Sequence, residues 1–324
     1  MGHTASSTTK VPPNWDATQI PSLKNKIAVV TGANSGIGYV TALELARHGA
    51  DVVLACRNES KGEEAAKTIR ETLSNVDGHG KVDAKQLDVS SLKSVQRFSD
   101  EFLLQHDKLD ILVNNAGVMA IPYEETVDGY EMQFATNHLG HFGLTTRLFD
   151  ALKHSPSARV VNVSSLAHHG AKMNKNTIMT GSKGYNPITA YSNSKLYNIL
   201  FTLEFDRRLK SSGITSITSA CAHPGISRTN LLVAPSTKNN FFRRLAFAAF
   251  AWLPVFQDAD MGALPSLYAA TALNVEGSDY FGPAQSRTGY PVLEEPSNES
   301  KSEEAATKLW QESERLAKLK FDVK

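Results

Sequence analysis

Tyr191 and Lys195, four residues apart, are the side chains of this sequence best suited to acid–base chemistry. The segment that holds them has a helical pattern, so both side chains fall on one face, one turn apart. A phenol, with an ordinary pKa of about 10, is a weak acid–base group at neutral pH. A neighbouring ammonium group favours the phenolate and lowers that pKa, and Tyr191 could then exchange a proton with a carbonyl or alcohol oxygen. Such pairs are common on helix surfaces, so the assignment depends on the motifs that accompany this one.

A glycine-rich segment is the second feature with a chemical use. Residues 31–38, TGANSGIG, follow the apolar run Ile27–Val30 and lead into a helical pattern. A strand, a glycine turn and a helix N-terminus together form a cradle for a pyrophosphate, because free backbone N–H groups and the positive end of the helix dipole face the anion. The dinucleotide-binding residues expected here are Gly32, Asn34, Ser35, Gly36, Ile37 and Gly38.

The residue after the second predicted strand decides which dinucleotide fits, because it meets the adenosine ribose. An acidic residue there would hydrogen-bond a free 2′-hydroxyl group, whereas this chain has Arg57 and Asn58. A guanidinium group offers a charged fork to a phosphate. Arg57 could instead be a solvated surface residue. We favour a 2′-phosphate contact and predict NADP (NADPH) as the cofactor, with Asn58 beside it.

The elements that would position these residues alternate along the chain. Apolar runs typical of strands cover Ile27–Val30, Asp51–Ala55, Ala84–Leu87, Ile111–Val113, Arg159–Val163 and Thr215–Ala220. Helical patterns cover Lys61–Leu73, Leu92–Gln105, Gly129–Lys153 and Ala190–Ser211. This alternation predicts a single doubly wound α/β domain, a parallel sheet with helices on both faces (a Rossmann fold).

Composition shifts suggest the boundaries of that domain. Residues 1–22 read as a polar lead-in, residues 23–290 as the domain, and residues 291–324 as an extension whose final helix, about Ser302–Lys320, would dock on the domain or serve as an interaction tail. The apolar stretch Leu245–Phe256 is shorter than the roughly 20 residues that span a bilayer. A buried helix or a substrate flap is favoured there over an interfacial anchor.

Composition also narrows the partners. A net charge of +1 at pH 7 predicts no nucleic-acid binding. Cys56 and Cys221 lie in apolar runs, which indicates buried free thiols. Without a signal-peptide pattern, a cytoplasmic location without membrane contact is expected.

His168 and His169 have no carboxylate or cysteine cluster beside them, so we predict no metal and interpret both as loop residues near the substrate mouth.

Taken in order, the segments TGANSGIG, LDVS, NNAG, NHLGHF, NVSS, YSNSK and HPG resemble the short-chain dehydrogenase/reductase family from about Lys26 to Gly282. The segments ACRN, NHLGHF and NVSSLAH are most similar to its retinol-dehydrogenase and WW-domain-oxidoreductase-like branch. We expect no WW domain in this sequence. The resemblance implies that Tyr191 is the acid–base group and that Lys195 lowers its pKa and holds the nicotinamide ribose. It casts Ser165, or less favourably Ser164, as the partner of the substrate oxygen, and Asn137 as the residue that positions a water toward Lys195.

The resemblance also implies further cofactor contacts. Asp88 and Val89 would contact the adenine, and Asn115, Ala116 and Gly117 would lie beside the adenosine ribose. The nicotinamide and its carboxamide would be bordered by Pro224, Gly225 and Thr229.

The function that follows is hydride transfer between NADP(H) and a small apolar carbonyl or alcohol, with reduction favoured. Residues 227–256 would cover the substrate, and their aromatic residues suggest a retinoid, a steroid, a lipid aldehyde or an aromatic ketone, in no preferred order. The family implies dimers or tetramers, although this branch includes monomers. The alternative is a non-catalytic NADP-binding module for interaction or redox sensing. The intact set of Asn137, Ser165, Tyr191 and Lys195 favours the enzyme.

Overall fold

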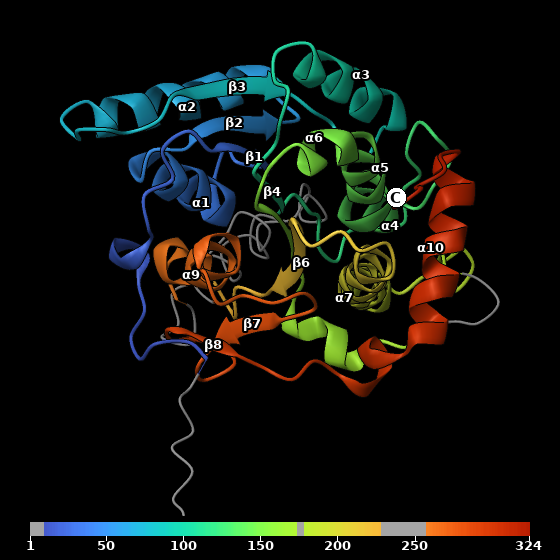
Figure 1. The fold of residues 1–324 in the computed structure, drawn as a ribbon. Coiled ribbons are helices and arrows are strands. Elements are labelled where there is room, and N and C mark those ends of the chain that lie inside the picture. The colour runs from blue at the N-terminus through green and yellow to red at the C-terminus, as the bar shows by residue number, and fades with distance from the viewer. Residues whose placement is uncertain (1–9, 174–177, 228–256) are drawn as a thin grey trace, which may run out of the picture.

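A sheet of eight strands forms the centre of the computed structural model, which describes residues 10–173, 178–227 and 257–324 (Figure 1). The strand order is β3-β2-β1-β4-β5-β6-β7-β8, so the order reverses between β1 and β4. The strands are β1 Ile27–Thr31, β2 Asp51–Cys56, β3 Val82–Gln86, β4 Ile111–Asn114, β5 Ala158–Val163, β6 Ile217–Ala222, β7 Tyr280–Pro283 and β8 Pro291–Leu293. In sheets of this kind, ligands bind at the carboxyl edge beside such a reversal.

Helices cover both faces of the sheet, which confirms the predicted doubly wound α/β fold (Figure 1). One face carries α1 Gly36–Arg47, α2 Glu59–Leu73 and α9 Ala259–Thr271. The other carries α3 Leu92–Leu103, α5 Gly140–Arg147, α6 Phe149–Lys153 and α7 Pro187–Ser211. The apolar residues of β1 alternate between the two cores, since Ala28 and Val30 face the first and Val29 the second.

The six predicted strands all form, with limits that differ by at most two residues, but β7, β8 and α9 were not predicted. Pro291, where the extension 291–324 is predicted to begin, instead starts β8, an edge strand antiparallel to β7. A proline lacks the backbone N–H, and this loss matters least at a sheet edge. Helix α9 contains Pro265 and is buried along Gly262–Thr271, so it lacks the amphipathic pattern from which helices are recognised.

The predicted helix Gly129–Lys153 is interrupted. The structure has a short helix α4, Met132–Phe134, then a π-helical segment η2, Ala135–Leu139, followed by α5 and α6. A π-helical segment inserts an extra residue into a helix and often marks a functional site. Asn137 therefore lies in a π turn rather than in a regular helix.

The described part of the predicted polar lead-in is not simply polar. A 3₁₀ turn, η1, covers Ala17–Gln19, and Val11, Trp15 and Ile20 are buried in the core between the sheet and α1 and α9. The ring of Trp15 meets that of Tyr268 edge-on at 5.0 Å. The chain before β1 thus contributes to the core.

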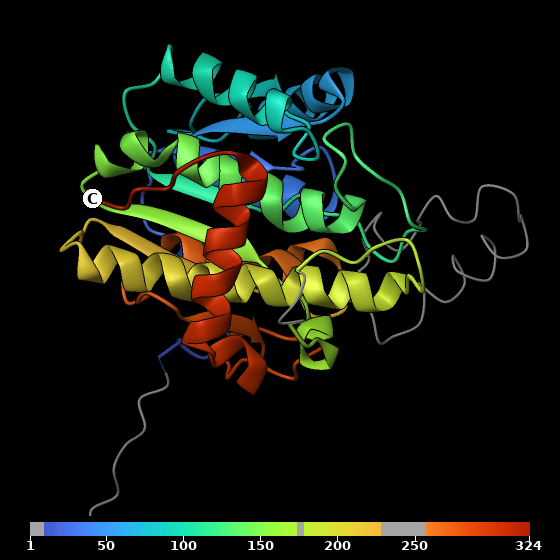
Figure 2. The ribbon, with the colours of Figure 1, turned by 90° about the vertical axis from the view of Figure 1, so that its right-hand side faces the viewer.

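The last helix, α10 Glu303–Ala317, lies across α7 (Figure 2). It follows a 3₁₀ turn, η6 Asn298–Lys301, and Ser302 caps it by accepting the N–H of Ala305. The indole ring of Trp310 packs against Phe142, Phe201 and Phe321 at centroid distances of 5.3, 5.8 and 4.7 Å. This aromatic cluster joins α5, α7 and the C-terminal residues.

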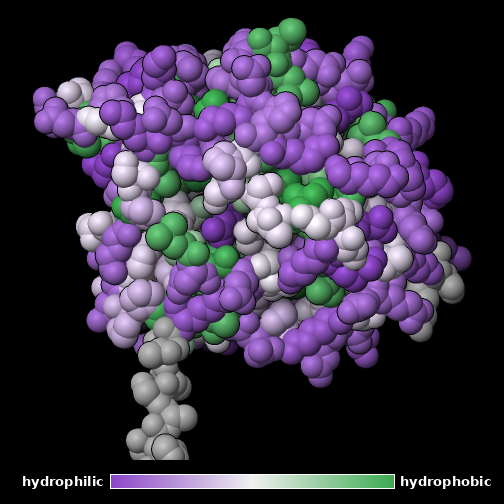
Figure 3. Space-filling view, viewed as in Figure 1, coloured by the Kyte–Doolittle hydropathy of each residue, from purple (hydrophilic) through white to green (hydrophobic). Residues whose placement is uncertain are grey.

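The surface is mainly hydrophilic on the face shown in Figure 3, where apolar residues form scattered patches. Among the described residues, no helix combines the length and the apolar character needed to cross a bilayer. The stretch Leu245–Phe256 lies outside the described residues.

Replacing Trp310 by alanine should lower the free energy of unfolding by about 3–5 kcal/mol, because the substitution leaves a cavity among aromatic rings. Urea unfolding at neutral pH measures this loss. Leu104→Ala is the control, since Leu104 is 87% exposed and its truncation should change stability by less than about 0.5 kcal/mol. Equal stability of Trp310→Ala and wild type would show that α10 does not contribute to the core.

Candidate active site

A cleft of about 560 Å³ lies at the carboxyl edge of the sheet and runs from the glycine turn to Tyr191. This volume is within the range of about 300–1,000 Å³ that small-molecule sites occupy. The predicted residues that line it are Gly32, Asn34, Ser35, Gly36, Ile37, Gly38, Arg57, Asp88, Val89, Asn115, Ala116, Gly117, Tyr191, Lys195 and Pro224. Four other predicted residues do not line it, namely Asn58, Asn137, Ser165 and Gly225, and Thr229 lies outside the described residues.

The glycine turn has the geometry of an anion cradle. Gly32 and Gly36 adopt φ values of +66° and +58°, which residues other than glycine rarely adopt. A Cβ atom at Gly38 would collide with the amide of Asn115 and the carbonyl of Gly32. Ser35 precedes α1 without a side-chain capping bond, so the first N–H groups of the helix are not satisfied by that side chain. These features fit the pyrophosphate of a dinucleotide.

Arg57 and Lys61 line the end of the cleft next to β2. Lys61 was not predicted, although a second basic residue four positions after Arg57 was a visible signal. Asn58 acts differently from its prediction: its Oδ1 accepts the N–H of Lys61 at 2.9 Å and caps α2. It therefore orients the helix that carries Lys61.

Asp88 and Asn115 support the cleft with side chains that are already engaged. Asp88 Oδ1 accepts the N–H and hydroxyl of Ser90, at 3.0 and 2.7 Å. Asn115 Nδ2 donates to Thr31 O at 2.8 Å and so joins the ends of β1 and β4. These bonds fix both side chains in the wall of the cleft.

Tyr191 lies in the first turns of α7 and is 8% exposed. Asn186 caps this helix by accepting the N–H groups of Ile188 and Thr189, each at 3.0 Å. The hydroxyl of Tyr191 is hydrogen-bonded to the side chain of Ser165. Lys195 lies one turn further along, with its Nζ 5.9 Å from the centre of the Tyr191 ring.

Burial controls the protonation of this pair. It raises the pKa of Tyr191, while the hydrogen bond with Ser165 acts in the opposite direction and does not offset it. It lowers the pKa of Lys195 to about 8, because the charged ammonium group is removed from water. In the protein alone burial therefore decides the direction for Tyr191, and the lowering of its pKa by Lys195 together with a bound nicotinamide stays a prediction. At neutral pH both groups carry their proton.

The two serines after β5 have different surroundings. Ser164 Oγ donates to Lys195 O at 2.8 Å and is buried, so it holds α7 against the sheet. Ser165 lies beside the Tyr191 hydroxyl and accepts the N–H of Ala167 at 3.2 Å. Ser164 lines the cleft and Ser165 does not, so the feature that favours Ser165 as the partner of a substrate oxygen is its contact with the Tyr191 hydroxyl.

Three hydrogen bonds to the protein fix the side chain of Asn137. Its Nδ2 donates to Val118 O at 3.0 Å and to Ser194 Oγ at 2.8 Å, and its Oδ1 accepts the N–H of Val118 at 2.8 Å. A Cβ atom at Gly117 would come within 3.0 Å of Asn137 Oδ1 and 3.5 Å of Lys195 Nζ. Asn137 Oδ1 and Lys195 Nζ thus both lie next to Gly117.

Pro224 borders the cleft at the end of β6, and its carbonyl is fixed by two donors. Ser227 Oγ and Gln257 Nε2 donate to Pro224 O at 2.7 and 2.8 Å. Gly225, with φ of +63°, donates its N–H to His223 Nδ1. Of the predicted flap 227–256, only Ser227 is among the described residues.

His168 was predicted to be a loop residue near the substrate mouth. In the structure it is buried in a 3₁₀ turn, η3 Leu166–Gly170. Its Nδ1 donates to Ser165 O at 2.7 Å and its Nε2 accepts the N–H of Ser297 at 3.1 Å. In the part of the chain that the structure describes, no three His, Cys, Asp or Glu residues are grouped closely enough to hold a metal. Cys56 and Cys221 are buried free thiols, as predicted.

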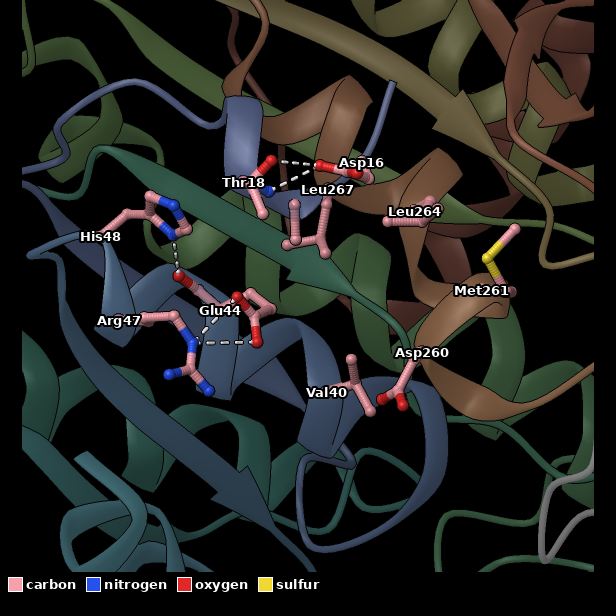
Figure 4. Close-up of a pocket in the computed structure, with 11 residues that line it drawn as sticks. Asp16, Thr18, Val40, Glu44, Arg47, His48, Asp260, Met261, Leu264 and Leu267 are labelled. Atoms are coloured by element: carbon pink, nitrogen blue, oxygen red, sulfur yellow. Dashed lines mark hydrogen bonds and ion pairs between the residues drawn. The ribbon is translucent and has the colours of Figure 1, made fainter. Parts of the chain in front are cut away.

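A second cavity, of about 630 Å³, lies between η1, α1 and α9 (Figure 4). Three of the charged residues that line it make local hydrogen bonds: Arg47 Nε donates to Glu44, and Asp16 accepts from Thr18. Leu264 and Leu267 line its α9 side. Neither the glycine turn nor the tyrosine–lysine pair contributes to it, so the cleft at the sheet edge is the candidate active site.

Comparisons with known proteins agree with the geometry. A family model described as short chain dehydrogenase matches residues 26–240. Retinol dehydrogenase 13 of Homo sapiens is 42% identical over 302 residues, which cover 92% of this chain and 86% of that protein. Retinol dehydrogenase 11 of Homo sapiens is 44% identical over 259 residues, which cover 80% and 77%.

Solved structures share the fold. A crystal structure of an uncharacterized protein from Mycobacterium paratuberculosis has a TM-score of 0.77 and 39% identity, and the match covers 95% of this chain and 99% of that one. L-sorbose reductase from Gluconobacter frateurii, solved with NADPH and L-sorbose, has a TM-score of 0.63 at 20% identity, with 81% and 95% covered. The second likeness concerns the fold alone.

The buried ammonium group predicts a pH dependence of stability. Between about pH 8 and the ordinary lysine pKa of 10.5, the unfolded chain binds more protons at Lys195 than the folded protein. Lys195 therefore makes the free energy of unfolding rise with pH in this window. Urea unfolding at several pH values should show wild type gaining stability relative to Lys195→Met above pH 8. Groups other than Lys195 are shared by both proteins and cancel in the comparison. A difference in the free energy of unfolding that stays constant with pH would contradict the lowered pKa of Lys195.

Proposed function

The chain belongs to the short-chain dehydrogenase/reductase family, and from that premise we propose that it is an NADP-dependent oxidoreductase that interconverts an apolar carbonyl compound and its alcohol. The reduction of an aldehyde or ketone is the favoured direction. The observation that carries the proposal is the contact of the Ser165 side chain with the Tyr191 hydroxyl, next to a cleft that Tyr191 and Lys195 line together with the glycine turn.

The proposed mechanism assigns the proton to Tyr191. Because burial keeps the phenol protonated at neutral pH, Tyr191 can donate to a carbonyl oxygen that Ser165 orients. The Lys195 ammonium group, with its pKa lowered to about 8, would stabilise the phenolate that remains and can itself exchange a proton near neutral pH. The bound dinucleotide supplies the hydride.

The residues around the cleft support a phosphorylated dinucleotide. Arg57 and Lys61 would place two positive charges beside the 2′-phosphate, where an acidic residue would repel it. Gly32, Gly36 and Gly38 would hold the pyrophosphate, and Tyr191 and Lys195 would lie at the nicotinamide end. Each part of the dinucleotide then has a counterpart along the cleft.

For the substrate we propose a retinoid first among the apolar classes. Relatives that are 42–44% identical over most of the chain are named retinol dehydrogenases. Val118, Met119 and Ile121 line the cleft and offer an apolar wall. Burial of such a wall against a polyene chain would contribute about 25 cal/mol per Å².

Tyr191→Phe tests the proposed proton donor. Without the phenolic hydroxyl, NADPH-dependent reduction of retinaldehyde should fall at least about 100-fold, the usual scale of a lost general acid. NADPH binding, measured by its fluorescence, should persist. Tyr197→Phe is the control: Tyr197 lies on the same helix, and its hydroxyl donates to Ile178 O away from the cleft. Full activity of Tyr191→Phe would refute the assignment.

Arg57→Asp tests the choice of cofactor. Reversing this charge should lower kcat/KM for NADPH and raise the relative use of NADH, because the carboxylate repels a 2′-phosphate and accepts a 2′-hydroxyl. Lys67→Asp is the control, because it reverses a charge on α2 at an exposed residue that does not line the cleft, and it should keep the wild-type ratio. If both variants keep the wild-type ratio of NADPH to NADH use, Arg57 is a solvated residue.

A further inference from the structure

His141 is a buried histidine, 2% exposed, that contacts both halves of the candidate site. Its Nε2 lies 2.9 Å from Thr31 Oγ1, at the last residue of β1. Its Nδ1 lies 3.2 Å from Asn137 O, in the π segment. The imidazole thus bridges Thr31, at the start of the glycine turn, and Asn137, whose side chain lies next to Gly117.

The partners of the ring fix its protonation. A carbonyl oxygen only accepts, so the hydrogen of the neutral ring lies on Nδ1 and is donated to Asn137 O. Nε2 then accepts from the Thr31 hydroxyl. Burial lowers the pKa of His141 to about 4, which keeps the ring neutral at neutral pH.

The Thr31 hydroxyl is fully used in this arrangement. Its hydrogen has two acceptors within reach, His141 Nε2 at 2.9 Å and Val113 O at 3.4 Å, and we assign it to the nearer one. Its oxygen accepts the backbone N–H groups of Asn115 and Ala116, each at 2.9 Å. A hydroxyl has one donor and two acceptor positions, and all three are filled. Asn115 and Ala116 line the cleft, and their backbone is what we call its floor. Thr31 and His141 therefore fix the position of this floor.

The other side of the ring leads to the catalytic helix. Asn137 Nδ2 donates to Ser194 Oγ at 2.8 Å, and Ser194 Oγ donates to Tyr191 O at 2.7 Å. The peptide of Asn137 lies in a π segment, where the hydrogen bonds of a regular helix are shifted by one residue. A side-chain donor to its carbonyl fixes the orientation of that peptide.

We propose that His141 is a positioning residue with two separable actions. Through Nε2 and Thr31 it holds the floor on which the dinucleotide lies, and through Nδ1–H it holds Asn137 and thereby the turn of α7 that carries Tyr191. The link to turnover rests on the proposed function, whereas the hydrogen-bond network itself does not.

Two substitutions separate these actions, because the amide of asparagine occupies the place of Nδ1 and that of glutamine the place of Nε2. His141→Gln keeps the acceptor for Thr31 and loses the donor to Asn137 O. It should retain the Kd for NADPH and lower kcat by about tenfold, the scale of one lost buried hydrogen bond. His141→Asn should do the reverse, with kcat retained and Kd for NADPH raised by about tenfold.

His138→Asn is the matched control. His138 is another buried histidine of the same segment, and its Nε2 lies 2.8 Å from Ser313 Oγ, among Phe134, Tyr197 and Phe201. It should lower the melting temperature and leave both kcat and Kd unchanged. The proposal would be overturned if both His141 variants showed the same decrease in kcat and the same increase in Kd for NADPH. A histidine that only fills the core cannot affect turnover in one variant and cofactor binding in the other.

Two measurements on the protein alone judge the network without turnover. The ¹⁵N shifts of the His141 ring should show hydrogen on Nδ1, and a ring protonated on Nε2 would overturn the proposal. Thr31→Val should speed hydrogen exchange at Asn115 and Ala116, and Thr31→Ser should restore protection; exchange that is equal in all three proteins would also overturn it. Wild type that binds NADPH but turns over no substrate would refute the proposed function instead.

Discussion

The carbonyl of Val163, at the end of β5, is the point on which the candidate site depends. Lys195 Nζ and Asn198 Nδ2 both donate to it, at 3.0 and 2.9 Å, and so fix α7 in register with the sheet. This register places Tyr191 beside Ser165, two residues after Val163. It also buries the ammonium group of Lys195, and that burial lowers its pKa to about 8. Position and proton affinity therefore have one cause.

The same contact explains why so many buried polar groups surround the site. Removing a charged lysine from water is costly unless hydrogen bonds compensate. Lys195 Nζ donates to Val163 O and Ser164 Oγ donates to Lys195 O, while Asn137 and Ser194 form a second chain of hydrogen bonds that ends at Tyr191 O. Buried polar networks whose hydrogen bonds are satisfied make a site rigid. The site is thus rigid on its α7 side, while much of the predicted substrate side, residues 228–256, lies outside the described residues.

Local patterns were sufficient to predict the six central strands, the glycine turn and the pairing of Tyr191 with Lys195, because each depends on neighbours in sequence. Helix α9 and strand β8 were missed, since Pro265 and Pro291 are tolerated only by virtue of where they lie in the fold. The π turn at Asn137 follows from tertiary contacts and leaves no mark in the periodicity. Likewise, the capping role of Asn58 and the buried state of His168 depend on partners that spacing alone does not reveal.

The most direct test of the account is NADPH consumption, followed by absorbance, with a panel of apolar aldehydes and ketones that includes retinaldehyde. The account predicts turnover of at least one panel member, with retinaldehyde foremost, and formation of the matching alcohol. NADPH that binds but is not consumed with any member would contradict a catalytic role for Tyr191, Ser165 and Lys195. That result would favour a protein that uses the same cleft only to bind the dinucleotide.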